Sequence, residues 1–217
     1  MNRDSLRCIC FDCDSTLSTI EGIDELAARA GCEAQIAPLT TAAMDGKLAI
    51  EDVYAKRLEI LKPGRDDLAW LGERYKATVV PGAQSAIDRL RQAGREVFII
   101  SGGIRGPVVE LAKSLGVGAA QVRAVDVRLD SAGRYAGFDS MSPLTRSNGK
   151  AVICAALKDE FGSVALVGDG VTDVAARSAG VYVIGFGGVA KRPAVVEGAN
   201  RFIDGPSLEA VADYLLG

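Results

Sequence analysis

Five short runs of apolar and β-branched residues recur along the chain, and each ends in polar or glycine-rich sequence. Such runs, bounded by turn-forming residues, are typical of buried strands in a parallel sheet. The pattern predicts strands at residues 8–11, 96–100, 164–167, 181–184 and 201–203.

Segments with helical periodicity lie between these runs, at residues 83–92, 107–114, 151–161, 173–178 and 207–216. Alternation of strands and helices favours an α/β fold, with a Rossmann-like, doubly wound parallel sheet. Two further strand-like segments, residues 121–129 and 134–138, are joined by Asp130-Ser131-Ala132-Gly133 and predict a small β-hairpin inserted in this fold.

The stretch from residue 17 to residue 76 breaks the alternation. It contains four helix-like segments without a convincing strand, at residues 23–30, 35–44, 50–61 and 66–75, separated by glycine and proline. A helical block that follows the first strand and precedes the return to the sheet indicates an inserted cap domain. We therefore expect a helical cap at residues 17–76 and a core formed by residues 1–16 plus 77–217.

Composition narrows the functional classes. The chain has 217 residues, a formal net charge of −3 and 48% hydrophobic residues, which does not suggest a disordered chain or a general nucleic-acid binder. We find no membrane-length apolar stretch and no signal peptide, so we expect a cytoplasmic monomer or homodimer without membrane or nucleic-acid partners. Histidine is absent, which excludes Ser-His-Asp and Cys-His catalysis.

Two acids, Asp12 and Asp14, directly follow the first predicted strand. In open α/β sheets the carboxyl ends of the strands form the edge where ligands bind. Neighbouring carboxylates repel each other and need a cation or a shared proton, and magnesium with a phosphate group satisfies that need. A calcium loop fits poorly, because Leu17 stands where glycine is required and Ile23 where a bidentate glutamate belongs.

Three more polar clusters occur close to the predicted strand ends or at the start of a helix. They are Ser101-Gly102-Gly103, the lysine of Ser147-Asn148-Gly149-Lys150, and Gly168-Asp169-Gly170-Val171-Thr172-Asp173. Each one alone has an ordinary explanation as a turn or a solvated side chain. Together they supply carboxylates, a hydroxyl, a lysine and glycines that allow close backbone approach, and so predict a site for a cation and a phosphate.

Two other motifs give weaker alternatives. Cys8, Cys10 and Cys13 could form a thiolate metal or redox site, although a buried structural role is more common for such cysteines. The segment 185–190 matches the glycine pattern of a dinucleotide-binding turn. It follows a late strand, and we expect Pro193 to interrupt the next helix, so this alternative is disfavoured.

The four clusters, in this order along the chain, resemble the haloacid dehalogenase superfamily. Segments 21–26, 43–46, 135–138 and 184–188 are similar to a branch of this superfamily that acts on phosphorylated serine. The resemblance covers nearly the whole chain, including the cap. It implies magnesium-dependent hydrolysis of a small phosphomonoester, O-phospho-L-serine, to L-serine and phosphate as the last step of serine biosynthesis.

The resemblance also implies roles for the acids. Asp12 would be the nucleophile that forms an aspartyl-phosphate intermediate, and Asp14 the general acid and base. Mg²⁺ would be held by Asp12, by Asp169 and by the backbone carbonyl of Asp14, with Asp173 in a supporting role. Catalysis would further use Ser101 and Lys150.

Substrate recognition would come mainly from the cap. Glu21 and Arg57 occupy the positions expected to bind the ammonium and the carboxylate of the substrate. The full set of expected substrate-binding residues is Glu21, Met44, Gly46, Arg57, Ser101, Gly102, Gly103 and Thr172. Two alternatives stay open: a phosphatase or phosphotransferase for another small phosphomonoester, and a non-catalytic ligand-binding protein on the same fold.

Overall fold

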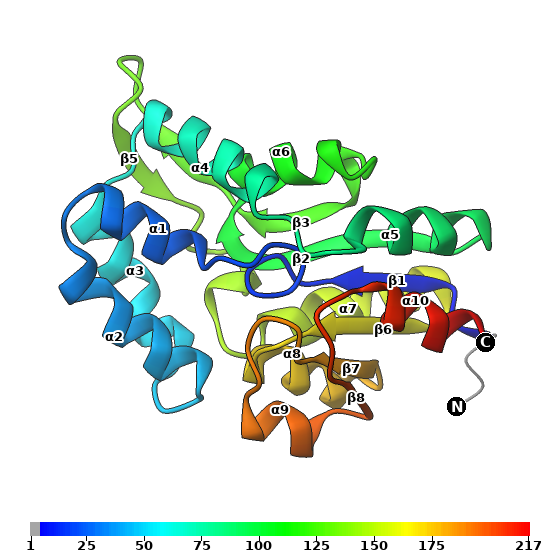
Figure 1. Cartoon of the computed structure of the whole chain (residues 1–217). Coiled ribbons are helices and arrows are strands. Elements are labelled where there is room, and N and C mark those ends of the chain that lie inside the picture. The colour runs from blue at the N-terminus through cyan, green and yellow to red at the C-terminus, as the bar shows by residue number, and fades with distance from the viewer. Residues whose placement is uncertain (1–4) are drawn as a thin grey trace.

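The computed structural model describes residues 5–217 and contains a six-stranded, fully parallel sheet at its centre (Figure 1). Its strands lie in the order β3-β2-β1-β6-β7-β8. Their bounds are β1 Cys8–Phe11, β2 Glu96–Ile104, β3 Val122–Val125, β6 Val164–Gly168, β7 Tyr182–Phe186 and β8 Arg201–Ile203. The predicted α/β class with a parallel sheet is confirmed.

Ten α-helices surround or extend this sheet in the described residues. They are α1 Gly22–Arg29, α2 Glu33–Met44, α3 Ile50–Leu61, α4 Arg65–Ala77, α5 Ala83–Gln92, α6 Arg105–Ser114, α7 Gly149–Phe161, α8 Val171–Ala175, α9 Pro193–Gly198 and α10 Glu209–Leu216. Helices α5 and α6 pack on β2, whereas α7 packs across β1, β2 and β6. None of these helices is both long and apolar enough to cross a membrane.

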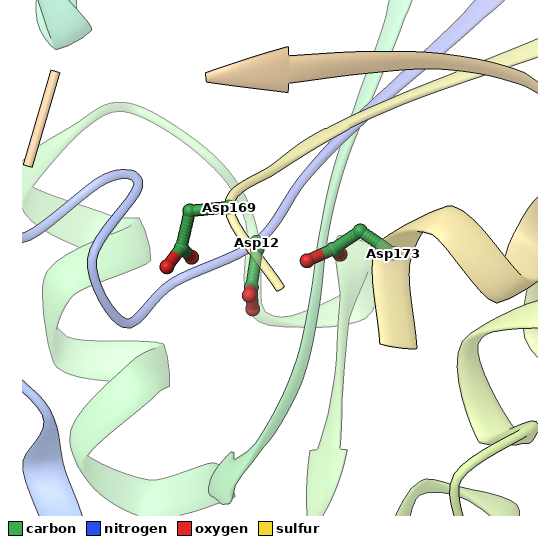
Figure 2. A group of neighbouring side chains, drawn as sticks. All are labelled: Asp12, Asp169 and Asp173. Atoms are coloured by element: carbon green, nitrogen blue, oxygen red, sulfur yellow. The ribbon is translucent and has the colours of Figure 1, made fainter. Parts of the chain in front are cut away.

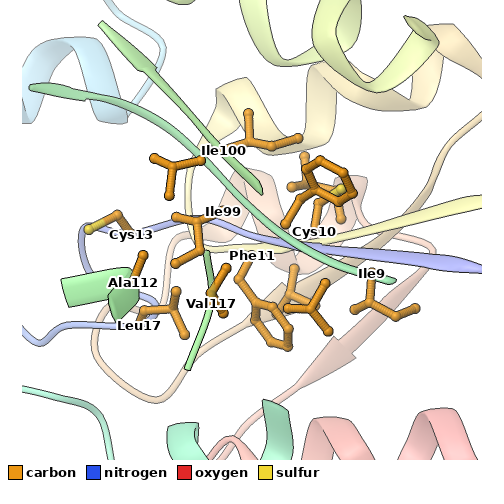
Figure 3. Close-up of a cluster of buried hydrophobic side chains, with 14 of the residues drawn as sticks. Ile9, Cys10, Phe11, Cys13, Leu17, Ile99, Ile100, Ala112 and Val117 are labelled. Carbon is orange, nitrogen blue, oxygen red and sulfur yellow. The ribbon is translucent and has the colours of Figure 1, made fainter. Parts of the chain in front are cut away.

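The central position of β1 explains why its sequence is apolar throughout. Its four residues are all buried, and the strand pairs in parallel with β2 on one side and β6 on the other. A strand that is covered on both faces reads as a continuous apolar run. Figure 3 shows Ile9 and Phe11 of β1 in the same cluster as Ile99 of β2 and Ala112 of α6. This packing holds the loop that begins at Asp12 on a rigid support.

The chain between β1 and α5 is helical, as the sequence predicts. Helices α1 to α3 lie to one side of the sheet, and α4 lies beside α6 (Figure 1). The two ends of this block meet where Ser18 pairs with Val79 in a short antiparallel bridge. We propose on this basis the division into a cap of residues 17–76 and a core of residues 1–16 plus 77–217, of which residues 1–4 lie outside the described part.

The prediction of one hairpin strand at residues 121–129 is wrong in part. Residues 122–125 form β3, which pairs in parallel with β2 in the main sheet. Only β4 Val127–Leu129 pairs with β5 Tyr135–Phe138 in a separate antiparallel sheet. Apolar and polar residues continue to alternate across exposed Asp126, so the alternation does not show where the chain leaves one sheet and enters the other.

Other bounds differ from the predictions. Strand β2 continues to Ile104, so the Ser101-Gly102-Gly103 cluster lies inside the strand, where its pairing with β3 shifts register. The helix expected at 173–178 is α8 followed by a 3₁₀ turn at Ala176–Ala179. Pro193 does not interrupt a helix but begins α9. Proline is favoured at the first helical position because its missing N–H has no intrahelical partner there.

Candidate active site

Asp12 stands at the end of the central strand. Its backbone N–H donates to the carbonyl of Val167, which continues the ladder between β1 and β6 for one more residue. Its carboxylate Oδ1 accepts a hydrogen bond of 2.7 Å from the backbone N–H of Cys13. The side chain is 3% exposed. The strand therefore delivers a nearly buried, fixed carboxylate to the carboxyl edge of the sheet.

Three buried acids converge at this edge, as Figure 2 shows for Asp12, Asp169 and Asp173. One oxygen of each lies within 4.8 Å of the others. The Nζ atom of Lys150, at the start of α7, lies 2.6 Å from Asp12 Oδ2 and 2.7 Å from Asp173 Oδ1. The predicted clusters after β1 and β6 and at the start of α7 are therefore brought together in one place.

The cluster carries an excess of negative charge. Burial, followed by the neighbouring Asp173, raises the pKa of Asp169 to about 7. Burial also raises the pKa of Asp12 well above its ordinary value, although Lys150 opposes the effect. Burial alone would lower the pKa of Lys150, but Asp12 and Asp173 raise it above its ordinary value. Hard carboxylate oxygens at this spacing fit a metal ion, which would relieve the repulsion among them.

Asp14 points toward the helical block. Its Oδ1 atom accepts two hydrogen bonds of 2.7 Å, one from the backbone N–H of Gly22 and one from the hydroxyl of Tyr75. Burial raises the pKa of Asp14, and these two hydrogen bonds oppose the rise. The result is a carboxyl group that is held in one orientation and whose protonated form is favoured relative to an exposed aspartate.

The glycines that follow Ser101 lie in the same region as the carboxyl group of Asp14. Ser101 is fully buried, and its Oγ accepts a hydrogen bond of 2.9 Å from the backbone N–H of Gly103. The carbonyl of Gly102 accepts a hydrogen bond of 2.9 Å from the hydroxyl of Tyr54 in α3. A Cβ atom at Gly103 would come within 3.0 Å of Ser101 Oγ and 3.2 Å of Asp14 Oδ2. Glycine at 103 thus leaves room between two predicted catalytic groups.

A single cavity of about 850 Å³, including the part open to solvent, joins the acids to the helical block. Of the residues predicted for the site, this cavity is lined by Asp12, Asp14, Glu21, Met44, Arg57, Gly102, Gly103, Lys150 and Thr172. Ser101, Asp169, Asp173 and Gly46 are not among its lining residues; the first three are fully buried. Gly46 has a different place. Its φ of +74° lies in the left-handed region, and an added Cβ would contact Val171, so its role is in the turn after α2.

The two residues predicted to recognise the substrate differ in their surroundings. Glu21 Oε1 accepts a hydrogen bond of 2.8 Å from Ser15 Oγ, and burial, followed by Asp14, raises the pKa of Glu21. Arg57 is 8% exposed rather than solvated as an ordinary helix arginine would be. Its guanidinium carbon lies 5.8 Å from the centre of the Tyr54 ring. Both side chains therefore present polar groups to a largely desolvated cavity, where a cation would favour the charged form of Glu21.

Two further residues bear on this site and were not predicted. Arg192 Nε lies 3.2 Å from Asp169 Oδ2, and its Nη2 lies 3.7 Å from Glu21 Oε1. It thus connects the acid cluster with the helical block. No spacing in the sequence sets Arg192 apart from other arginines. Tyr75 falls on an apolar position of a predicted helix, where the pattern indicates only a core residue.

The structure gives the weaker motifs ordinary packing roles. Cys8, Cys10 and Cys13 are fully buried free thiols, and the one metal-suited group found among residues 5–217 consists of aspartates alone. In segment 185–190, added Cβ atoms at Gly187 and Gly188 would come within 2.6 Å of Phe202 and 2.2 Å of Phe186. Those glycines therefore accommodate aromatic rings.

Comparison with known proteins agrees with this arrangement. Residues 6–180 match the model of the haloacid dehalogenase-like hydrolases. Phosphoserine phosphatase of Mus musculus is 37% identical over 197 residues, which cover 90% of this chain and 88% of the mouse protein. A solved structure described as a phospho-aspartyl intermediate analogue of phosphoserine phosphatase is 28% identical, with a TM-score of 0.81 over 96% of this chain and 98% of that one. A substrate-bound phosphoserine phosphatase complex is 27% identical, with a TM-score of 0.83 and the same coverage.

The fold and the buried acids are thus those of a haloacid dehalogenase-like hydrolase. Within that superfamily, identity over nine-tenths of the chain shows that the protein belongs to the phosphoserine phosphatase family.

Proposed function

We propose that this protein hydrolyses O-phospho-L-serine to L-serine and inorganic phosphate, with Mg²⁺ as its metal ion. The observation that carries the proposal is the shared cavity, which is lined both by Asp12 and Lys150 and by the cap residues Glu21 and Arg57. This reaction is the last step of serine biosynthesis. It belongs to small-molecule metabolism, and on that ground we propose a cytoplasmic location.

Asp12 acts as the nucleophile. Its carboxylate oxygen forms a bond to phosphorus while the bond from phosphorus to the seryl oxygen breaks, which yields an aspartyl phosphate. The 2.6 Å contact with Lys150 supports this role, because the ammonium neutralises charge where the phosphoryl oxygens gather. Gly102 and Gly103 line that end of the cavity, and Ser101 Oγ, which accepts a hydrogen bond from the backbone N–H of Gly103, would bind the phosphoryl group there.

Asp14 moves the proton. In its protonated form it gives that proton to the departing seryl oxygen, and it then takes a proton from the water that attacks the aspartyl phosphate. The second step breaks the bond between Asp12 and phosphorus and releases phosphate. The two 2.7 Å hydrogen bonds to Asp14 Oδ1 leave Oδ2 to face the cavity near Gly103, which supports this role.

The carboxylates of Asp12 and Asp169 and the backbone carbonyl of Asp14 would hold Mg²⁺, and Asp173 would orient Lys150. The buried oxygens of the three aspartates, all within 4.8 Å of one another, suit a hard divalent cation. When bound, the cation neutralises negative charge on the phosphoryl oxygens.

Recognition of serine rests on two charges. Glu21 pairs with the substrate ammonium and Arg57 with its carboxylate, while Met44 and Thr172 line the same cavity. The relatives support this assignment, since phosphoserine phosphatases are similar to the chain over both the core and the helical block. Charge-assisted hydrogen bonds of this kind contribute about 1.5 to 3 kcal/mol each when the cavity excludes water.

The test is release of phosphate from phosphoserine and from p-nitrophenyl phosphate, which lacks the amino-acid groups. We expect activity on both with Mg²⁺ and none after EDTA treatment. Arg57→Ala and Glu21→Gln should each lower kcat/KM for phosphoserine about ten- to two-hundredfold and affect p-nitrophenyl phosphate far less. Lys56→Ala, at an exposed lysine of the same helix, is the matched control. Equal losses on both substrates would mean that the enzyme is a broad phosphatase.

A further inference from the structure

Arg57 has more hydrogen-bonding capacity than its protein partners use. Its side chain is buried, and its Nε atom has no hydrogen-bond partner among the described residues. The guanidinium lies beside the Tyr54 ring and lines the cavity. A long, flexible side chain with unpaired donors does not keep one orientation by itself, so another contact must hold it.

That contact is the hydroxyl of Thr40, which is 2% exposed in α2. Thr40 Oγ1 accepts a hydrogen bond of 3.3 Å from Arg57 Nη1. The same oxygen lies 2.7 Å from Asp24 Oδ1 and 3.4 Å from the carbonyl of Ile36. A hydroxyl has one proton, and the shorter distance to a charged acceptor assigns that proton to Asp24. Thr40 therefore turns a lone pair toward Arg57.

Asp24 completes the chain from α1. Burial raises its pKa, whereas Thr40 and then Arg57 lower it. Within residues 5–217 no ion pair joins Asp24 directly to Arg57 at 4.0 Å or less, so the hydroxyl of Thr40 stands between the opposite charges. Three consecutive helices, α1, α2 and α3, each supply one member of this chain. Asp24 attracts the guanidinium, and Thr40 keeps it from moving onto that carboxylate.

We propose that Thr40 and Asp24 are positioning residues for Arg57, which orient its free donors into the cavity and so determine preference for a substrate that carries a carboxylate. This inference rests on the proposed function and deepens it. Neither residue needs to touch the reacting phosphoryl group, since both act through the guanidinium.

The direct test is Thr40→Val, which replaces the hydroxyl with a methyl group of similar size. Without the hydroxyl, residue 40 offers Arg57 no lone pair, so the guanidinium is no longer held in its orientation and can turn toward Asp24 and away from the cavity. We expect KM for phosphoserine to rise about five- to tenfold, with kcat changed by less than about twofold, as for loss of one ordinary hydrogen bond, because the guanidinium is misoriented but not removed. The ratio of kcat/KM for phosphoserine to that for p-nitrophenyl phosphate should fall by the same factor.

Two variants separate positioning from a general structural effect. Thr40→Ser keeps the hydroxyl and should restore the ratio to within about twofold of wild type. Thr41→Val makes the same change at the neighbouring exposed threonine and should leave all parameters unchanged. Asp24→Asn keeps an acceptor for Thr40 but removes the charge, and should lower the ratio in the same direction. It also tests the inference if Thr40→Val does not fold.

The outcomes distinguish this inference from the function on which it rests. Wild-type protein that does not hydrolyse phosphoserine would overturn both. Normal wild-type hydrolysis, with an unchanged substrate ratio in Thr40→Val and Asp24→Asn, would overturn the positioning role alone. The same conclusion would follow if Thr40→Val lost activity equally on both substrates, or if Thr40→Ser failed to restore the ratio.

Discussion

Gly22→Ala should disable the catalytic centre through the carboxyl group of Asp14. Gly22 begins α1, and its backbone N–H donates to Asp14 Oδ1. A Cβ atom built at this position would lie 2.0 Å from the hydroxyl oxygen of Tyr75, 2.7 Å from its Cζ and 3.3 Å from Asp14 Oδ1. Tyr75 is 1% exposed, and its ring packs in the hydrophobic core, so it can relieve the clash only by shifting within the site. The added methyl group must therefore displace the hydroxyl that donates to Asp14.

The size of the effect follows from what is lost. Burial, followed by Asp14, raises the pKa of Tyr75 well above its ordinary value, so its hydroxyl stays protonated and acts as a donor. Loss of one hydrogen bond to a charged group costs about 1.5 to 3 kcal/mol. If the bond holds Asp14 in its reactive orientation, kcat should fall about ten- to one-hundred-and-fifty-fold. Overpacking should also lower the free energy of unfolding by about 1 to 3 kcal/mol.

The assay is kcat for p-nitrophenyl phosphate together with urea denaturation. In the proposed mechanism, turnover of this substrate depends on Asp14 as the base that activates water but not on recognition of the amino acid. Gly106→Ala in α6 is the matched control, because an added Cβ there meets no atom within 4 Å. The Tyr75→Phe background removes the hydroxyl oxygen, so Gly22→Ala should lower kcat much less there than in wild type. If Gly22→Ala lowered kcat by the same factor in both backgrounds, the proposed path through Tyr75 would be refuted.

Three further predictions concern the acids and the core. Asp12→Asn should abolish phosphate release while phosphoserine still binds, which calorimetry can measure; near-wild-type turnover would exclude Asp12 as nucleophile. Arg192→Ala removes positive charge beside Asp169, so we expect the free energy of unfolding in EDTA to fall by about 1 to 3 kcal/mol. Addition of Mg²⁺ should then raise the melting temperature of the variant more than that of wild type. Equal shifts in melting temperature would argue against this role of Arg192. Ile99→Ala truncates a fully buried side chain and should lower the free energy of unfolding, measured by urea denaturation, by about 2 to 5 kcal/mol. Val152→Ala, at a 48% exposed position, should lower it by less than about 0.5 kcal/mol. Similar losses in the two variants would contradict the assigned core.

The sequence predicted the sheet well because its central strands are buried on both faces. Strand β1 matches its predicted bounds, since apolar residues continue until Asp12 begins the loop. The clusters that contain Asp12, Lys150 and Asp169 were expected to converge, and they do, because parallel strands bring their carboxyl ends to one edge. A pattern along the chain is therefore sufficient to predict where a side chain lies when strand topology alone determines its position.

The local sequence pattern did not predict element bounds or side-chain positions that depend on tertiary contacts. Strand β2 continues beyond Ser101-Gly102-Gly103 because Ile104 pairs again with Val125 of β3 after a shift in register, although serine and glycines predict a turn. The change of sheet near Asp126 is likewise set by pairing partners rather than by side-chain alternation. The loop before α9 sets the position of Arg192. Its three acidic neighbours come from segments distant in sequence and are Glu21, Asp45 and Asp169.

Contacts between the helical block and the sheet connect the residues proposed for substrate recognition with those proposed for catalysis. Asp14, from the loop after β1, is held by Gly22 and Tyr75 of that block, and the carbonyl of Gly102 accepts a hydrogen bond from Tyr54. Tyr54 in turn lies against Arg57. Because the groups that orient the acid and the groups that line the substrate pocket belong to the same helices, a displacement of those helices changes both. We propose that productive geometry at Asp14 requires the helices to occupy the position in which Arg57 and Glu21 line the cavity, and that a substrate with the matching charges favours hydrolysis by holding them there.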